Sequence, residues 1–164
     1  ADTGKLLQKI PIADESQVAG GVAIDQGYVF SGSRSGKVLQ AEIATGKILW
    51  TNADSESEVF STPAVSDDWV IVGSYDEKVY ALDRKTGVAR WTFDTGGMPT
   101  SAVIAGDKVL LGADGTLFLL RLADGAKLWS LKISDEISSP AVVPGMVLVG
   151  SDDGSVYAFG PGKP

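Results

Sequence analysis

The sequence predicts an all-β fold, a β-propeller with four blades of four antiparallel strands in a chain of 164 residues. Two observations carry this prediction. Several sequence markers recur with a period of about 40 residues, which is the length of one propeller blade. Each repeat also divides into four short segments rich in apolar and β-branched residues, separated by turn residues. No segment keeps a helical period over roughly 11 residues.

Four kinds of marker set the period. Tryptophan recurs at Trp50, Trp91 and Trp129, with spacings of 41 and 38 residues. The other three markers are a glycine that ends an apolar run, a Thr-Gly or Asp-Gly turn, and a small residue before an apolar pair. The glycines are Gly32, Gly73, Gly112 and Gly150. The turns are Thr3-Gly4, Thr45-Gly46, Thr86-Gly87 and Asp124-Gly125. The small residues are Ala23, Ala64, Ala102 and Ala141.

The four segments of each repeat are predicted to be strands, numbered from the propeller axis outwards. Small apolar residues form the first segment, as the crowding around a central axis requires. The first strands are expected at 21–24, 63–65, 101–104 and 140–143, and the second at 28–32, 69–73, 108–112 and 146–150. The third are expected at 37–43, 78–83, 116–122 and 155–159, and the fourth at 47–51, 88–93, 127–131 and 5–10.

Residues 1–164 are therefore expected to form a single domain, with blades at about 19–51, 60–93, 99–131 and 138–159 plus 5–10. The last blade lacks its own fourth strand, and the N-terminal strand is expected to complete it, within the chain or in a partner chain. Three assemblies follow: two chains that close one eight-bladed ring, four blades that close alone, or head-to-tail strand exchange into a filament. We favour the first, a homodimer.

Composition excludes several functions. The net charge of −7 argues against nucleic-acid binding. The chain has no cysteine and no histidine, which removes thiolate nucleophiles, His-based triads and the usual zinc ligands. No apolar run approaches the roughly 18 residues of a membrane span. We therefore predict no catalytic, metal-binding or cofactor-binding residues.

The segment from Ala81 to Trp91 contains Asp83, Thr86 and Gly87, and Glu42, Thr45, Gly46 and Trp50 repeat the pattern one blade earlier. This pattern resembles the turn motif of the PQQ-like repeat β-propeller family. The resemblance implies the fold and a periplasmic or extracellular location. One group of relatives holds a quinone and calcium and oxidises alcohols. Another binds no cofactor and docks partner proteins, as does the lipoprotein of outer-membrane β-barrel assembly. The familiar quinone enzymes have a vicinal cysteine pair that this sequence lacks.

The repeated tryptophans are interpreted as packing between blades, with each indole N–H bonded to a backbone acceptor. The Thr-Gly turns are interpreted as hairpin corners, because a phosphate loop would need a Gly-rich stretch that ends in Lys-Ser/Thr and opens a helix. Trp69 departs from the repeat and is expected to be partly exposed, as a candidate contact residue.

Strand order places most acidic residues on one loop face, including Asp14, Glu15 and the pair Asp152-Asp153. Such a surface would attract a basic partner or divalent cations, although acidic loops also serve solubility alone. The candidate partner-binding residues are Arg34, Glu56, Glu58, Trp69, Tyr75, Asp76, Glu77, Asp114, Asp135, Glu136, Asp152 and Asp153.

The function predicted from these observations is a non-catalytic scaffold for protein–protein interaction or extracytoplasmic assembly, binding another protein or copies of itself. Two alternatives remain: a fragment of a PQQ-dependent dehydrogenase, and a sensor domain that binds a small ligand in the central channel.

Overall fold

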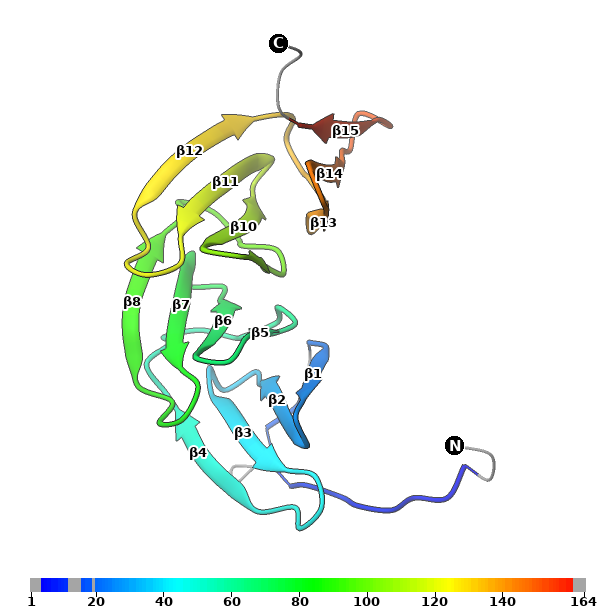
Figure 1. Cartoon of the computed structure of the whole chain (residues 1–164), viewed down its shortest axis with the longest axis vertical. Helices are drawn as coiled ribbons and strands as arrows, with labels where there is room; N and C mark the ends of the chain where they lie inside the picture. Colours follow the sequence, from blue (N-terminus) through cyan, green and yellow to red (C-terminus); the bar gives the residue numbers. More distant parts are fainter. Residues whose placement is uncertain (1–3, 12–15, 19, 161–164) are drawn as a thin grey trace.

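The computed structural model describes residues 4–11, 16–18 and 20–160, and these contain strands and no helix. Fifteen strands form three four-stranded antiparallel sheets and one three-stranded sheet. Figure 1 shows the four sheets side by side along an open arc, with β1, β5, β9 and β13 on the inner side and β4, β8 and β12 on the outer side. The predicted propeller fold is confirmed.

The strands follow the repeat closely. Blade 1 contains β1 (Val22–Asp25), β2 (Tyr28–Gly32), β3 (Val38–Glu42) and β4 (Ile48–Asn52). Blade 2 contains β5 (Ala64–Val65), β6 (Trp69–Gly73), β7 (Lys78–Asp83) and β8 (Ala89–Asp94). Blade 3 contains β9 (Val103–Ala105), β10 (Lys108–Ala113), β11 (Thr116–Arg121) and β12 (Lys127–Lys132), and blade 4 contains β13 (Ala141–Val143), β14 (Met146–Gly150) and β15 (Val156–Phe159).

The hydrophobic core lies between blades, because each sheet presents apolar residues on both faces. Phe30, Val38 and Trp50 of blade 1 pack with Val70 and Leu82 of blade 2. A second core joins blades 2 and 3, and a smaller one joins blades 3 and 4. Period-2 alternation in the strands therefore assigns successive side chains to the two neighbouring blades.

The predicted role of the tryptophans is confirmed in the first two blades. The indole N–H of Trp50 donates to the carbonyl of Arg84 in blade 2 at 2.8 Å, and Trp91 donates to Leu122 in blade 3 at 2.8 Å. Each indole also covers the turn glycine of the next blade. A Cβ on Gly87 would lie 2.5 Å from the Trp50 ring, and one on Gly125 would lie 2.6 Å from Trp91. The tryptophan and glycine of the repeat are thus two halves of one inter-blade contact.

The turn motif holds itself in place around Asp83. Its carboxylate accepts hydrogen bonds from the backbone N–H groups of Lys85 and Thr86, both at 2.9 Å, and from the Thr86 hydroxyl at 3.0 Å. The Arg90 guanidinium pairs with the same carboxylate and holds the pKa of Asp83 at about 2. Gly87 follows with a φ of 72°, a left-handed conformation that glycine adopts without strain.

The sequence left open whether residues 5–10 complete blade 4 of their own chain or of a partner, and the structure does not show the first arrangement. Residues 5–10 form no strand, and β15 has no neighbour on its outer side among the described residues. Figure 1 shows the N-terminal segment beside blade 1, at the opposite end of the arc from β15. Strand pairing needs the two edges within hydrogen-bonding distance, and the open arc keeps them apart.

Candidate interaction surfaces

One loop face carries an exposed cluster of aromatic and charged side chains where blades 1 and 2 meet. The Arg34 guanidinium carbon lies 5.5 Å from the centre of the Phe60 ring, within cation–π range. The rings of Phe60 and Tyr75 have their centres 4.5 Å apart, and Tyr75 is 41% exposed. Glu58 accepts a hydrogen bond from the Ser57 hydroxyl at 2.7 Å. That bond, then a backbone hydrogen bond and last the charge of Arg34 hold the pKa of Glu58 below its usual value.

Arg34, Glu58 and Tyr75 are among the contact residues predicted from the sequence, whereas Phe60 is not. Phe60 lies in the irregular segment before β5, where it follows no period and matches no marker of the repeat. An aromatic residue in a loop otherwise rich in serine and glutamate was the available signal, since aromatic side chains are enriched at binding surfaces. We call Arg34, Phe60 and Tyr75 the aromatic cluster.

Asp76 lies beside this cluster but serves the fold. Its carboxylate accepts hydrogen bonds from the Tyr80 hydroxyl at 2.5 Å, from the Glu56 backbone N–H at 3.0 Å and from the Lys78 backbone N–H at 3.2 Å. Burial by itself would raise the pKa of Asp76, but these bonds outweigh it and the pKa is lowered. Glu56 and Glu77 are exposed, and the carboxylate of Glu56 lies 4.0 Å from the ammonium group of Lys78.

A second acidic group lies where blades 3 and 4 meet. Asp114, Asp135, Glu136, Asp152 and Asp153 are all exposed. The Tyr157 hydroxyl donates to Asp153 at 2.6 Å, and this bond holds the pKa of Asp153 below its usual value. Among the described residues, no group of three or more acidic side chains is arranged to hold a metal ion. Asp14 and Glu15 lie outside the described residues.

Trp69 lies away from both groups. It begins β6, at the opposite end of that strand from Tyr75 and Asp76. Its ring centre is 6.5 Å from that of Trp91, and the Arg90 guanidinium carbon lies 4.4 Å above the ring. Trp69 packs against the core between blades 2 and 3, so it forms no part of the acidic loop face.

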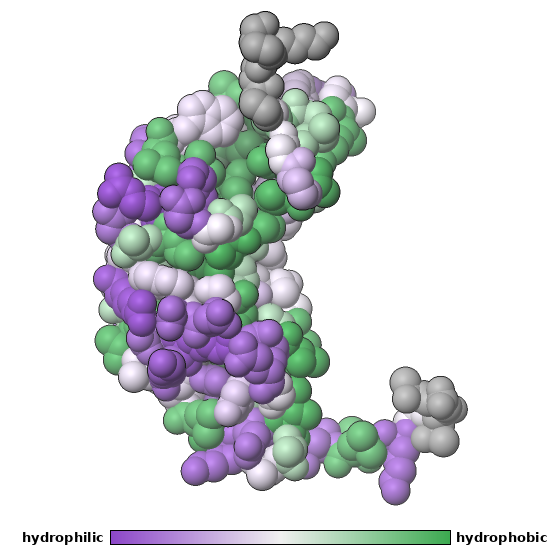
Figure 2. Space-filling model, viewed as in Figure 1, coloured by the Kyte–Doolittle hydropathy of each residue, from purple (hydrophilic) through white to green (hydrophobic). Residues whose placement is uncertain are grey.

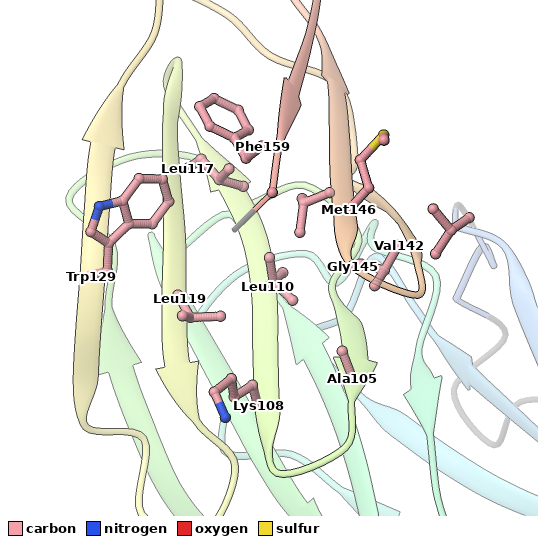
Figure 3. A pocket seen from close by; sticks show the side chains of 13 residues that line it. Ala105, Lys108, Leu110, Leu117, Leu119, Trp129, Val142, Gly145, Met146 and Phe159 are labelled. Carbon is pink, nitrogen blue, oxygen red and sulfur yellow. The ribbon is translucent and has the colours of Figure 1, made fainter. Parts of the chain in front are cut away.

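Between blades 3 and 4 lies a cavity of about 570 Å³. Figure 3 shows Trp129 and Leu119 on one side of it and Val142 and Met146 of blade 4 on the other. The lining is almost wholly apolar, with Lys108 at its margin. Figure 2 shows hydrophobic surface (green) at the end of the arc where β13 and β14 lie.

Comparison with known proteins agrees with this geometry. A family model described as outer membrane protein assembly factor BamB matches residues 1–161. The chain belongs to this family. The resemblance to PQQ-like repeat propellers that the turn motif indicated is therefore confirmed.

Among curated BamB proteins, that of Xanthomonas campestris is 34% identical over 149 residues, and the match covers 88% of this chain and 36% of that protein. The BamB of Yersinia pestis is 32% identical, with 79% of this chain and 38% of that protein covered. The serine/threonine-protein kinase AfsK of Streptomyces griseus is 31% identical, but the match covers only 17% of it. The chain thus spans little more than a third of the BamB relatives it matches.

Solved structures give the same fold. The crystal structure of BamB from Moraxella catarrhalis superposes with a TM-score of 0.76 at 28% identity, over 89% of this chain and 47% of that one. The computationally designed Ika4 protein superposes with a TM-score of 0.81 at 22% identity, over 96% of this chain and 100% of that one, which shows the fold alone. No described helix is long and apolar enough to cross a membrane.

Proposed function

We propose that the protein is a non-catalytic scaffold that works in outer-membrane protein assembly, on the periplasmic or extracellular side of the cell. The family match over residues 1–161, with relatives named as assembly factors, carries this proposal. A non-catalytic role also fits the chemistry of the chain, because it offers neither cysteine nor histidine.

The aromatic cluster is the proposed docking surface. Tyrosine and arginine are enriched at the points of an interface that carry most of its binding energy. The exposed carboxylates of Glu56 and Glu77 flank the cluster, so a partner with aromatic and basic side chains fits both its apolar and its charged parts. The acidic residues between blades 3 and 4 would steer the same basic partner electrostatically.

Binding of a synthetic peptide rich in Tyr, Lys and Arg, followed by fluorescence anisotropy, tests this surface. We expect binding that weakens with salt, and at least a fivefold loss of affinity in the variant Tyr75→Ala. A peptide in which Glu replaces Lys and Arg serves as the charge control. The variant Asp67→Asn, on the opposite loop face, should bind normally. Equal affinity of Tyr75→Ala and the unmodified protein would refute docking at the aromatic cluster.

We further propose that two copies close one eight-bladed ring. Support comes from the face of blade 4 that is turned away from blade 3, where Val156 is 72% exposed. The equivalent residue to Val156 in blade 2, Val79, is completely buried by blade 3. An uncovered apolar face of this kind fits a fifth blade. Light scattering should give a mass of about twice 17.1 kDa, whereas a monomer at every concentration would refute the ring.

A further inference from the structure

The N-terminal segment lies beside blade 1 in the place of a missing strand. In blades 1 and 2 the fourth strand sets its tryptophan over the turn glycine of the next blade, as Trp50 does over Gly87. Gln8 takes that position against the turn glycine of blade 1. A Cβ on Gly46 would lie 2.3 Å from the Gln8 amide nitrogen. Residues 5–10 therefore run where the fourth strand of a blade preceding blade 1 would run.

In blade 4, the position of the fourth strand beside β15 is unoccupied among the described residues. Trp129 repeats Trp50 and Trp91, but it is 40% exposed, whereas Trp50 is 8% exposed. Its ring meets Phe159 edge-on, at 6.0 Å between centres. No turn glycine of a following strand covers it in the part of the chain that the structure describes. Among residues 4–11, 16–18 and 20–160, no fourth strand pairs with β15 and no turn glycine contacts Trp129.

Gly4 has the properties of that absent glycine. Its φ of 59° resembles those of the three turn glycines Gly46, Gly87 and Gly125, which are 70°, 72° and 71°. In the single chain, however, a Cβ on Gly4 would meet nothing within 4 Å. Its turn conformation is present, but the tryptophan that covers the other turn glycines is not.

We infer that residues 5–10 of a second copy pair antiparallel with β15 as the fourth strand of blade 4. Gly4 of that copy then lies against the ring of Trp129, as Gly87 lies against Trp50. This inference rests on the proposed shared ring and specifies its junction. Because the segment already lies beside blade 1, docking it onto β15 of the second copy also brings that copy's blade 4 against blade 1. Leu6 and Leu7 are 77% and 87% exposed in the single chain, and they become partly buried in this arrangement.

The other blades fix the register of this pairing. In blade 2, Ala81 pairs with Trp91 and Leu82 with Ala89, with a bulge between the two pairs. Blades 1 and 3 have the bulge at the same place. The repeat makes Ala158 equivalent to Ala81 and Gln8 equivalent to Trp91. Ala158 therefore pairs with Gln8 of the second copy, and Phe159 with its Leu6.

Engineered cysteines test this register without interference, because the natural chain has none. Directly opposed residues on paired strands have Cβ atoms about 4.5–5.5 Å apart, close enough to form a disulfide after a small adjustment. The double variant Gln8→Cys/Ala158→Cys is oxidised and run on a non-reducing gel. We expect a covalent dimer that returns to the monomer on reduction. The matched control, Gln8→Cys/Tyr157→Cys, should cross-link poorly because its two side chains point to opposite faces of the sheet.

The outcomes separate the junction from the ring. A ladder of higher multimers would support the junction but refute the closed ring. A disulfide confined to the monomer would overturn the inference, because the strand would then close its own chain. A dimer by light scattering without a disulfide would overturn the junction and leave the ring intact.

A second variant gives an independent readout. Gly4→Ala places a methyl group against Trp129 at the junction but meets open space in the single chain. We expect the dimer dissociation constant to rise at least tenfold, while Gly27→Ala, at an open turn, leaves it unchanged. An unchanged dissociation constant in Gly4→Ala would contradict the contact with Trp129.

Discussion

The inter-blade contact between Trp50 and Gly87 gives the sharpest test of what holds the blades together. In Gly87→Ala, the new Cβ would lie 2.5 Å from the indole ring, closer than any real contact. The ring has little room to retreat, because its N–H is bonded to Arg84 at 2.8 Å and it lies in the buried core. The substitution also places a non-glycine residue at a φ of 72°. Two costs therefore combine at one position.

Gly27→Ala isolates one of them. Gly27 has a φ of 83°, and a Cβ there would meet nothing within 4 Å. The backbone cost is about 1–2 kcal/mol for an alanine in the left-handed region. Overpacking a filled core costs about 1–3 kcal/mol more. We therefore expect Gly27→Ala to lose about 1–2 kcal/mol of unfolding free energy and Gly87→Ala about 2–5 kcal/mol.

Urea unfolding followed by circular dichroism measures both variants. Thermal unfolding should agree, with Tm falling by about 2–4 °C per kcal/mol for a chain of this size. If the two variants lose the same free energy within about 0.5 kcal/mol, the tryptophan–glycine contact does not stabilise the blade interface, and the reasoning is refuted.

Two further predictions concern the carboxylates. Tyr80→Phe removes a partly buried hydrogen bond to the Asp76 carboxylate and should lower the unfolding free energy by about 1.5–3 kcal/mol. Tyr157→Phe removes the same kind of bond in an exposed setting and should change the unfolding free energy little. Equal losses would contradict the role of burial. Asp83 has a folded-state pKa of about 2, below its ordinary 3.8, chiefly because Arg90 donates to it. Its ionised form therefore stabilises the fold above about pH 4, and this contribution is lost as the pH falls towards 2. Unfolding measured between pH 6 and 2 should show a shallower acid loss in Asp83→Asn, and an unchanged pH profile would count against this linkage.

The strands of the first three blades were predictable because their signals are local. Alternation of apolar residues, glycine turns and the spacing of Trp50 and Trp91 all reflect constraints that each blade meets within about 40 residues. The inter-blade role of the tryptophans followed from the same repeat. The self-stabilised turn at Asp83 explains why this short motif identifies the family, since its side chains satisfy the backbone of its own turn.

The candidate surface was only partly predictable. Arg34, Glu58 and Tyr75 were singled out by charge and loop position, but Phe60 was missed because its contacts join loops of two blades. Asp76 was counted with the acidic surface although its carboxylate is held by Tyr80 and by backbone groups. The sequence assigns a carboxylate to a loop, but only the folded loop determines whether its oxygens are free.

The sequence by itself determined the all-β fold, the four repeats and the places of fifteen strands, although many strand ends differ by a residue or two from those predicted. These features depend on interactions within and between adjacent repeats. The tertiary structure decided where residues 5–10 lie and which polar loop residues are free. It placed the N-terminal segment beside blade 1 and left β15 as an edge, with its tryptophan partly exposed. The physical reason is the range of the interactions involved. A strand can be recognised from its own residues, but the strand that pairs with it at the end of the chain depends on the angle that accumulates from blade to blade along the arc.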